Sequence, residues 1–186
     1  RDAIEPLISN GAPIVSVGVF TIPTLDSVNV NYTTGVTQAL DFLISECPGR
    51  IAFFGPGITD EVSTLDTFAP DAGIEVRVAT YHELMTRHKR KIEIIPGNPG
   101  SRRESTQVFM QHIDEYGCPD AIFCFNDDLA IAALRALHEL DIDIPAGVML
   151  VGCDGLDDTL YVTPTLSSVE QPFTQMVARS LELLER

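Results

Sequence analysis

The sequence of 186 residues lacks any long hydrophobic run. No apolar stretch approaches the roughly 18 residues that a transmembrane helix needs, so we expect no contact with a membrane. The first residues also lack the apolar segment of a signal peptide. The composition, 45% hydrophobic and 21% charged, is ordinary for a globular protein and excludes a disordered or low-complexity chain. The length favours one domain or two small ones.

Motifs that carry catalysis or bind metals are missing as well. The sequence contains neither G-x-S-x-G nor a phosphate-binding P-loop motif, and no pair of nucleophile and base stands out. The acidic residues around Asp154 do not follow the calcium-binding EF-hand pattern. We therefore predict that the chain is not an enzyme and that it uses no metal and no cofactor.

The few cysteines show neither C-x-x-C nor the spacing of zinc ligands. They are Cys47, Cys118, Cys124 and Cys153. Two of them, Cys124 and Cys153, stand inside apolar runs, where a thiol behaves as a small hydrophobic group. Buried free thiols favour a reducing compartment, so the sequence predicts a cytoplasmic protein.

Positive charge is scarce, because 12 basic residues face 27 acidic ones and the formal net charge is −15. Such a chain binds nucleic acid poorly by itself, since that affinity rests on neutralising phosphates. Residues 77–103 are the exception, with seven basic residues opposed only by Glu83 and Glu93. This window is typical of a basic helix end near Lys89, and an anionic ligand or partner site is the alternative.

Short apolar runs alternate with helical patterns along the chain. We expect strands at 13–19, 51–54, 91–95, 121–125, 148–151 and 166–169. Helices are expected after a cap at Asn31, at 75–90, from Ser101, at 128–140 and at 173–184, with a loop at 58–73. Ser101 with Glu104 forms a capping box. Fully apolar strands separated by helices predict an α/β fold whose mostly parallel sheet is sandwiched by helices.

Ligands of open parallel sheets bind beyond the carboxyl ends of the strands, so the residues that follow each strand are candidates for a site. Asn126 follows one strand and Asp154 follows the next. An amide and a carboxylate at neighbouring strand ends suit a polyhydroxylated or amine-bearing small molecule. The alternative is that the polar residues after strand 121–125 cap the next helix, and we expect Asp127 to be that cap.

Three runs resemble the effector domain of the LacI/GalR transcriptional regulators. They are PDAIFCFNDDLA at 119–130, IPAGVMLVGCD at 144–154 and YVTPTLSSVEQP at 161–172. The resemblance extends over most of residues 12–185. It implies a periplasmic-binding-protein-like fold of two α/β lobes with the ligand between them. One lobe would be complete and the other partial in this chain.

The resemblance also implies domain boundaries and site residues. Residues 1–46 would be a remnant of the first lobe with a crossover helix, 47–170 the second lobe, and 171–186 a helix that crosses back. Asn126 and Asp154 would line the effector cleft. Arg77 matches a family arginine that precedes an aromatic residue by four positions, here Tyr81.

The function implied is ligand sensing for a repressor. A small polar effector, sugar-like or nucleoside-like, would bind between the lobes and control a homodimer. DNA would be bound only by a helix-turn-helix segment that these residues do not contain. The candidate dimer face is helix 128–140, with Leu129 and Ala133, together with the loop around Tyr161.

Two other functions share parts of this pattern. A periplasmic sugar-binding protein of a transporter would have the same lobes and the same cleft, although the turn at 144–148 and the run at 161–172 are more similar to the regulators. A small α/β enzyme is the third hypothesis, and it lacks a nucleophile with its base. A signal peptide or a helix-turn-helix encoded upstream would separate the first two.

Overall fold

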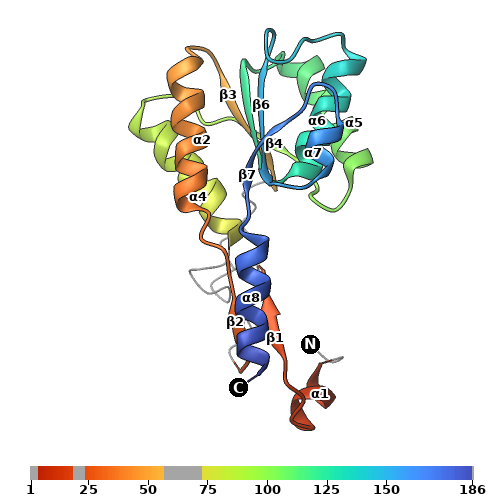
Figure 1. The fold of residues 1–186 in the computed structure, drawn as a ribbon. Coiled ribbons are helices and arrows are strands. Elements are labelled where there is room, and N and C mark those ends of the chain that lie inside the picture. The colour runs from red at the N-terminus through yellow and green to blue at the C-terminus, as the bar shows by residue number, and fades with distance from the viewer. Residues whose placement is uncertain (1–3, 19–23, 57–72, 186) are drawn as a thin grey trace.

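Five parallel strands form the larger sheet of the computed structural model, which describes residues 4–18, 24–56 and 73–185. The strands are β3 (Ile51–Gly55), β4 (Ile94–Pro96), β5 (Ala121–Cys124), β6 (Met149–Asp154) and β7 (Ser167–Glu170). Their order across the sheet is β4-β3-β5-β6-β7. All neighbouring pairs are parallel, so all five carboxyl ends meet at one edge (Figure 1).

Helices cover both faces of this sheet (Figure 1). On one side lie α2 (Thr33–Glu46) and α4 (Gly73–Arg87), and on the other α5 (Arg102–Tyr116) and α6 (Asp127–Glu139). Successive residues of β3 show the two faces directly. The Phe53 ring lies 5.5 Å from Tyr81 of α4, whereas the Phe54 ring lies 5.0 Å from Phe109 of α5. The expected α/β sandwich is therefore confirmed.

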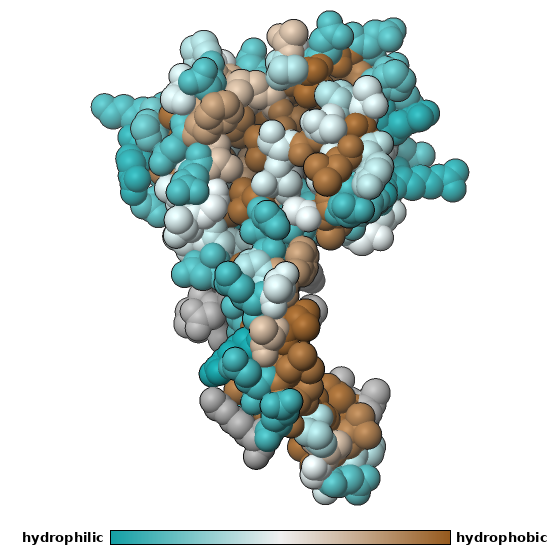
Figure 2. Space-filling model, viewed as in Figure 1, coloured by the Kyte–Doolittle hydropathy of each residue, from teal (hydrophilic) through white to brown (hydrophobic). Residues whose placement is uncertain are grey.

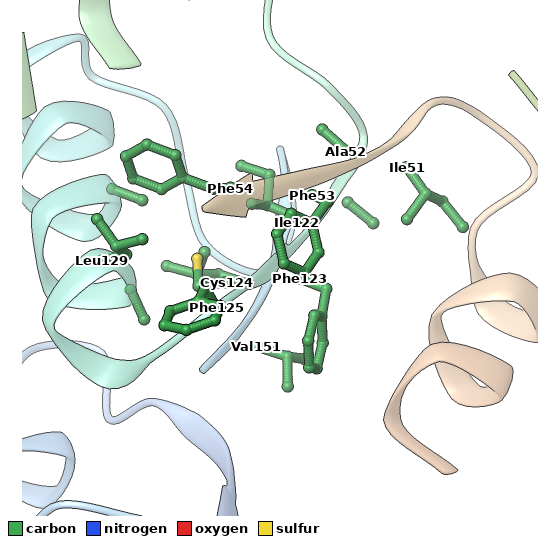
Figure 3. Close-up of a cluster of buried hydrophobic side chains, with 14 of the residues drawn as sticks. Ile51, Ala52, Phe53, Phe54, Ile122, Phe123, Cys124, Phe125, Leu129 and Val151 are labelled. Atoms are coloured by element: carbon green, nitrogen blue, oxygen red, sulfur yellow. The ribbon is translucent and has the colours of Figure 1, made fainter. Parts of the chain in front are cut away.

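The core of the molecule lies around β3 and β5, whose side chains are almost wholly excluded from water (Figure 3). Phe53, Phe54, Ile122 and Phe123 have no exposed surface. Burying a side chain of this size contributes about 1.5–3 kcal/mol. Continuous apolar strands in the sequence were the correct signal for a sheet that is covered on both faces.

A second, smaller sheet pairs β1 (Val15–Val17) with β2 (Asp26–Val28), also in parallel. Helix α8 (Phe173–Leu184) packs against both strands, and Met176 is its buried residue. Helices α1 (Glu5–Ser9) and α7 (Asp158–Tyr161) complete the chain. The outer side of α8 leaves apolar side chains exposed, and Figure 2 shows them along the smaller part of the molecule. They are Phe173, Val177, Leu181 and Leu184.

Most expected elements are present, with shifted ends. The helix expected at 173–184 has those bounds, and Ser101 accepts the Glu104 N–H as the capping box requires. The expected loop at 58–73 lies almost wholly outside the described residues. Within the described ranges no helix is long and apolar enough to cross a bilayer.

Packing places α2 differently from the expected division at residue 46. Val36, Leu40 and Leu43 of this helix belong to the core of the larger sheet. The helix therefore covers the same lobe as β3 to β7, because its apolar face has the larger sheet to pack against. By packing, the boundary between the two parts lies before residue 33.

Candidate functional site

Asp154 ends β6 and stands at the edge of the sheet where the expected site residues meet. Three donors converge on its Oδ1 atom. Gln171 Nε2 donates at 2.7 Å, Tyr32 Oη at 3.4 Å, and Arg77 Nη1 lies at 3.8 Å. The other oxygen, Oδ2, takes part in none of these contacts, and 17% of the side chain is exposed. A ligand hydroxyl or amine can therefore donate to Oδ2.

The backbone and the ionisation of Asp154 are both unusual. Its φ angle is 137°, which a residue other than glycine rarely adopts, and such outliers are frequent at binding sites. Burial raises the pKa of the Asp154 carboxyl above its usual value, while Arg77 acts in the opposite direction.

Arg77 of α4 reaches the same place and is almost fully buried. Its guanidinium lies between two aromatic rings, 4.0 Å from the centroid of Tyr32 and 4.2 Å from that of Phe125. Nη1 also donates to the Phe125 carbonyl oxygen. The structure thus brings Arg77 and Asp154 together, and their contact with a ligand stays a prediction.

One donor of Arg77 is left over. Its Nε is buried and has no hydrogen-bond partner among the described residues. A buried donor without a partner costs about 1–3 kcal/mol. Among the described residues, this nitrogen is the polar group near Asp154 that the protein itself leaves unsatisfied.

Asn126 lies beside the site and caps the following helix. Its Oδ1 accepts the Leu129 N–H at 3.0 Å, and its backbone is extended, as an N-cap requires. The expectation that Asp127 is the cap is therefore wrong. The amide nitrogen of Asn126 takes no part in the cap, and its contact with a ligand stays a prediction.

Asp127 is instead buried, and its hydrogen bonds link α6 to the loop after β6 and to β7. Its carboxylate accepts the Leu156 N–H at 2.7 Å and the Ser168 hydroxyl at 2.6 Å. Gly152 makes room for it, since a Cβ at that position would come within 2.2 Å of Asp127 Oδ1. These contacts hold the loop after β6 and the strand β7 in place next to Asp154.

Sequence reasoning missed Tyr32, Phe125 and Gln171 as residues of the site. Gln171 directly follows β7, so the rule about strand ends could have found it. Phe125 immediately follows β5, and its apolar side chain was assigned to the strand. Tyr32 precedes a helix, and no local pattern marks such a residue as facing a strand end far along the chain.

The expected dimer residues do not share a surface. Leu129 and Ala133 have no exposed area, because they face the sheet from α6. In this structure neither side chain can reach a second chain, and the expectation is corrected for both. Tyr161 is 80% exposed and its neighbour Leu160 is 64% exposed.

Part of the basic window at 77–103 is engaged within the chain. Arg87 pairs with Glu83 at 2.5 Å. Arg90 donates to the carbonyls of Ile44 and Gly49 near the end of α2. These contacts agree with basic residues that serve helix ends, although Arg77 goes to the candidate site.

A separate cavity of about 700 Å³ lies between β4 and α5. Buried Glu93 accepts from Arg50 Nη2 at 2.5 Å and lies 3.0 Å from His112 Nε2 at its wall. None of the residues at the carboxyl end of β6 lines this cavity. The ion pairs there are satisfied within the protein, so we place the candidate site at Asp154 and not here.

Comparison with known proteins gives a consistent picture. Residues 40–186 match the family described as periplasmic binding protein-like domain. The chain is 25% identical over 184 residues to the lactose operon repressor of Escherichia coli, which is 98% of this chain and 47% of that protein. It is 38% identical over 64 residues to the transcriptional regulator MalR of Clostridium butyricum, 34% of this chain and 19% of that protein. The chain thus spans about half or less of these curated relatives.

Solved structures agree on the fold. A LacI family transcriptional regulator from Enterococcus faecium with bound ribose superposes with a TM-score of 0.79 at 22% identity, over 100% of this chain and 66% of that one. The lac repressor dimer bound to operator and the anti-inducer ONPF superposes with a TM-score of 0.72 at 25% identity, over 99% and 62%. The fold is periplasmic-binding-protein-like, and the relatives named are regulators, which agrees with the expectation that the chain is not an enzyme.

Proposed function

The chain belongs to the periplasmic-binding-protein-like domain family as an effector-binding domain of the LacI/GalR type, and from this premise we propose that it senses a small polar effector through Arg77 and Asp154. The effector is sugar-like or nucleoside-like and carries both hydroxyl donors and oxygen acceptors. It binds between the two parts of the molecule and controls DNA binding by a separate helix-turn-helix segment.

One contact carries this proposal. Arg77 Nη1 lies 3.8 Å from Asp154 Oδ1 beyond the carboxyl ends of the strands, and both side chains are largely buried. Opposite charges this close leave little net charge, which favours a neutral polar ligand over an ion. For its polar groups we assign one donor and one acceptor: the Arg77 Nε, which has no hydrogen-bond partner among the described residues, and the Asp154 Oδ2, which takes part in none of the contacts given above.

Homodimer formation and a cytoplasmic location belong to the same proposal. Around Tyr161, the second part of the expected dimer face, Leu160 and Tyr161 are both exposed in this structure. The repressor structure named above is a dimer on its operator, which supports an assembly of this kind. The effector would act by stabilising one arrangement of the dimer over another.

The alternative of a transporter's sugar-binding protein shares the fold and the cleft. The two relatives named above are transcriptional regulators, and they favour regulation. The alternative therefore ranks second.

Titration calorimetry tests the proposal with a panel of ribose, glucose, sucrose and adenosine. We expect the wild-type chain to bind one of them with measurable heat. The Asp154→Ala variant should bind it at least about tenfold more weakly, because a hydrogen bond to a charged group contributes about 1.5–3 kcal/mol.

Asp41→Ala is the matched control, since it removes the same charge from an exposed position on α2. Its affinity should equal that of the wild type. The site assignment is wrong if Asp154→Ala binds the same compound unchanged, and the effector class is wrong if no member of the panel binds.

A further inference from the structure

Two short segments connect the larger sheet with the smaller one. Residues 29–32 lead from β2 into α2, and residues 171–172 lead from β7 into α8 (Figure 1). Since β2 and α8 both belong to the smaller part, any change in how the two parts are placed passes through these connections.

Both connections are held by the carboxylate that forms the candidate site. Tyr32, at the end of the first segment, donates its hydroxyl to Asp154 Oδ1 at 3.4 Å. Gln171, in the second, donates its side-chain amide to the same oxygen at 2.7 Å and its backbone N–H to the Asp154 carbonyl at 2.9 Å. Asp154 therefore fixes both connections at one point, although Tyr32 is 122 residues away along the chain.

Tyr32 also touches the second charged residue of the site. Its ring lies 4.0 Å from the Arg77 guanidinium, and the tyrosine is 5% exposed. The start of α2 is pressed against β7, because a Cβ at Gly35 would come within 2.6 Å of Val169 Cγ1. Tyr32 thus has little freedom to move away from Asp154 unless the connection itself moves.

We propose that Tyr32 and Gln171 are positioning residues that couple occupancy of Asp154 to both connections between the sheets. The inference rests on the proposed function for the identity of the site, and it adds how that site reaches the rest of the molecule. A ligand that hydrogen-bonds Asp154 Oδ2 changes the orientation and the charge density of the carboxylate. The hydrogen bonds that Tyr32 and Gln171 donate to Oδ1 then strengthen or weaken together. The two connections are therefore restrained or loosened at the same time.

Coupling of this kind has an energetic condition. An effector shifts the equilibrium between two arrangements of the parts only if it binds one arrangement more tightly than the other. The size of the shift equals the difference between the two binding free energies. Because Asp154 contacts the effector on one oxygen and both connections on the other, that difference arises at a single side chain. Residues elsewhere on the larger sheet need not move.

Amide hydrogen exchange measured by NMR on the full chain tests the coupling without any effector. The Gln171 N–H, bonded to the Asp154 carbonyl, reports on the second segment. The Val36 N–H, bonded to the Tyr32 carbonyl, reports on the first. In Tyr32→Phe, which removes only the hydroxyl, we expect exchange at Gln171 to speed up by at least about fivefold.

The reciprocal variant gives the second arm. Gln171→Leu should speed exchange at Val36 by a similar factor, and the double variant should add little to either single one. Tyr116→Phe is the control, because this tyrosine is 59% exposed and ends α5, a helix that contributes no contact to Asp154 among the described residues. The proposal is overturned if each variant changes exchange only in its own segment, which is what local packing alone would do.

An NMR pH titration that follows the Asp154 carboxyl carbon measures the pKa of Asp154. A change in local packing alone does not change this pKa. The charged groups facing this carboxyl are Arg77 from α4 and Asp127 from α6, and both remain in the variants. The Tyr32 and Gln171 hydrogen bonds lower the pKa of Asp154, so each single variant should raise it. An unchanged pKa of Asp154 in both variants would contradict the proposal.

If no compound of the calorimetry panel binds, the proposed effector class is refuted, and the exchange and pKa measurements are unaffected.

Discussion

Asp127 and Asp128 are neighbours in the sequence and differ completely in their surroundings. Asp127 has no exposed surface and accepts two hydrogen bonds, whereas Asp128 is partly exposed and pairs with exposed Arg102 at 2.6 Å. Nothing in the sequence distinguishes the two carboxylates. At this scale the environment, and not the residue type, decides the role.

The pair gives a matched test of stability. Asp127→Ala leaves the Leu156 N–H and the Ser168 hydroxyl without their acceptor, so we expect it to lower the free energy of unfolding by about 3 kcal/mol. Asp128→Ala removes a surface ion pair and should cost less than about 1 kcal/mol. Urea unfolding of both variants measures the difference, and equal losses would contradict the role given to Asp127.

Glu93 makes a prediction about pH. Burial acts to raise the pKa of this carboxyl, but its hydrogen bonds with Arg50 and His112 prevail and hold the pKa below the usual 4.5. A lowered pKa in the folded state contributes stability above the usual pKa, and this stability is lost as the pH falls. The wild type should therefore exceed Glu93→Gln in unfolding free energy at pH 7, and the gap should shrink as the pH drops below about 4.5. A gap that stays constant with pH would contradict this reading.

Among the elements, helix α6 shows what a pattern of residues can and cannot predict. The sequence predicted a helix at 128–140, and its residues Leu129, Ala133 and Leu137 are buried in the core. The residue that caps the helix could not be predicted, because asparagine and aspartate cap equally well and only the backbone geometry chooses between Asn126 and Asp127. The family resemblance also implied a dimer face at Leu129 and Ala133, and both residues are buried in the core.

The cap carries its own prediction. Asn126→Ala should lower the free energy of unfolding by about 1 kcal/mol, while Asn126→Ser, which keeps a capping oxygen, should cost only a few tenths. Thermal or urea unfolding measures both. Equal losses for the two variants would mean that the Leu129 N–H gains nothing from the cap.

The candidate site itself was only partly predictable. Asn126 and Asp154 follow from strand ends, which are local in sequence. Arg77 required a family resemblance, and its contact with Asp154 depends on how α4 lies across the sheet. Tyr32 and Gln171 come from the two connections between the sheets, and their meeting at one carboxylate is a property of the tertiary fold.

For the whole molecule, the arrangement of two sheets joined by two connections agrees with the family's fold.

A substitution at the exposed Tyr161 tests the proposed assembly. Tyr161→Arg should weaken self-association at least about tenfold in analytical ultracentrifugation, because it places charge in the centre of the proposed face. Tyr116→Arg, at another exposed tyrosine, is the control and should associate as the wild type does. Equal effects of both variants would remove Leu160 and Tyr161 from the interface.

The central claim is that the effector binds at the carboxyl ends of β5 and β6. Chemical-shift mapping of the isotope-labelled wild-type chain tests it most directly, during a titration with the compound among ribose, glucose, sucrose and adenosine that binds in calorimetry. The account predicts saturable shifts at Asp154, Asn126 and the Arg77 side chain. Saturable shifts at Glu93 and His112, beside the cavity between β4 and α5, with none at Asp154, would contradict it.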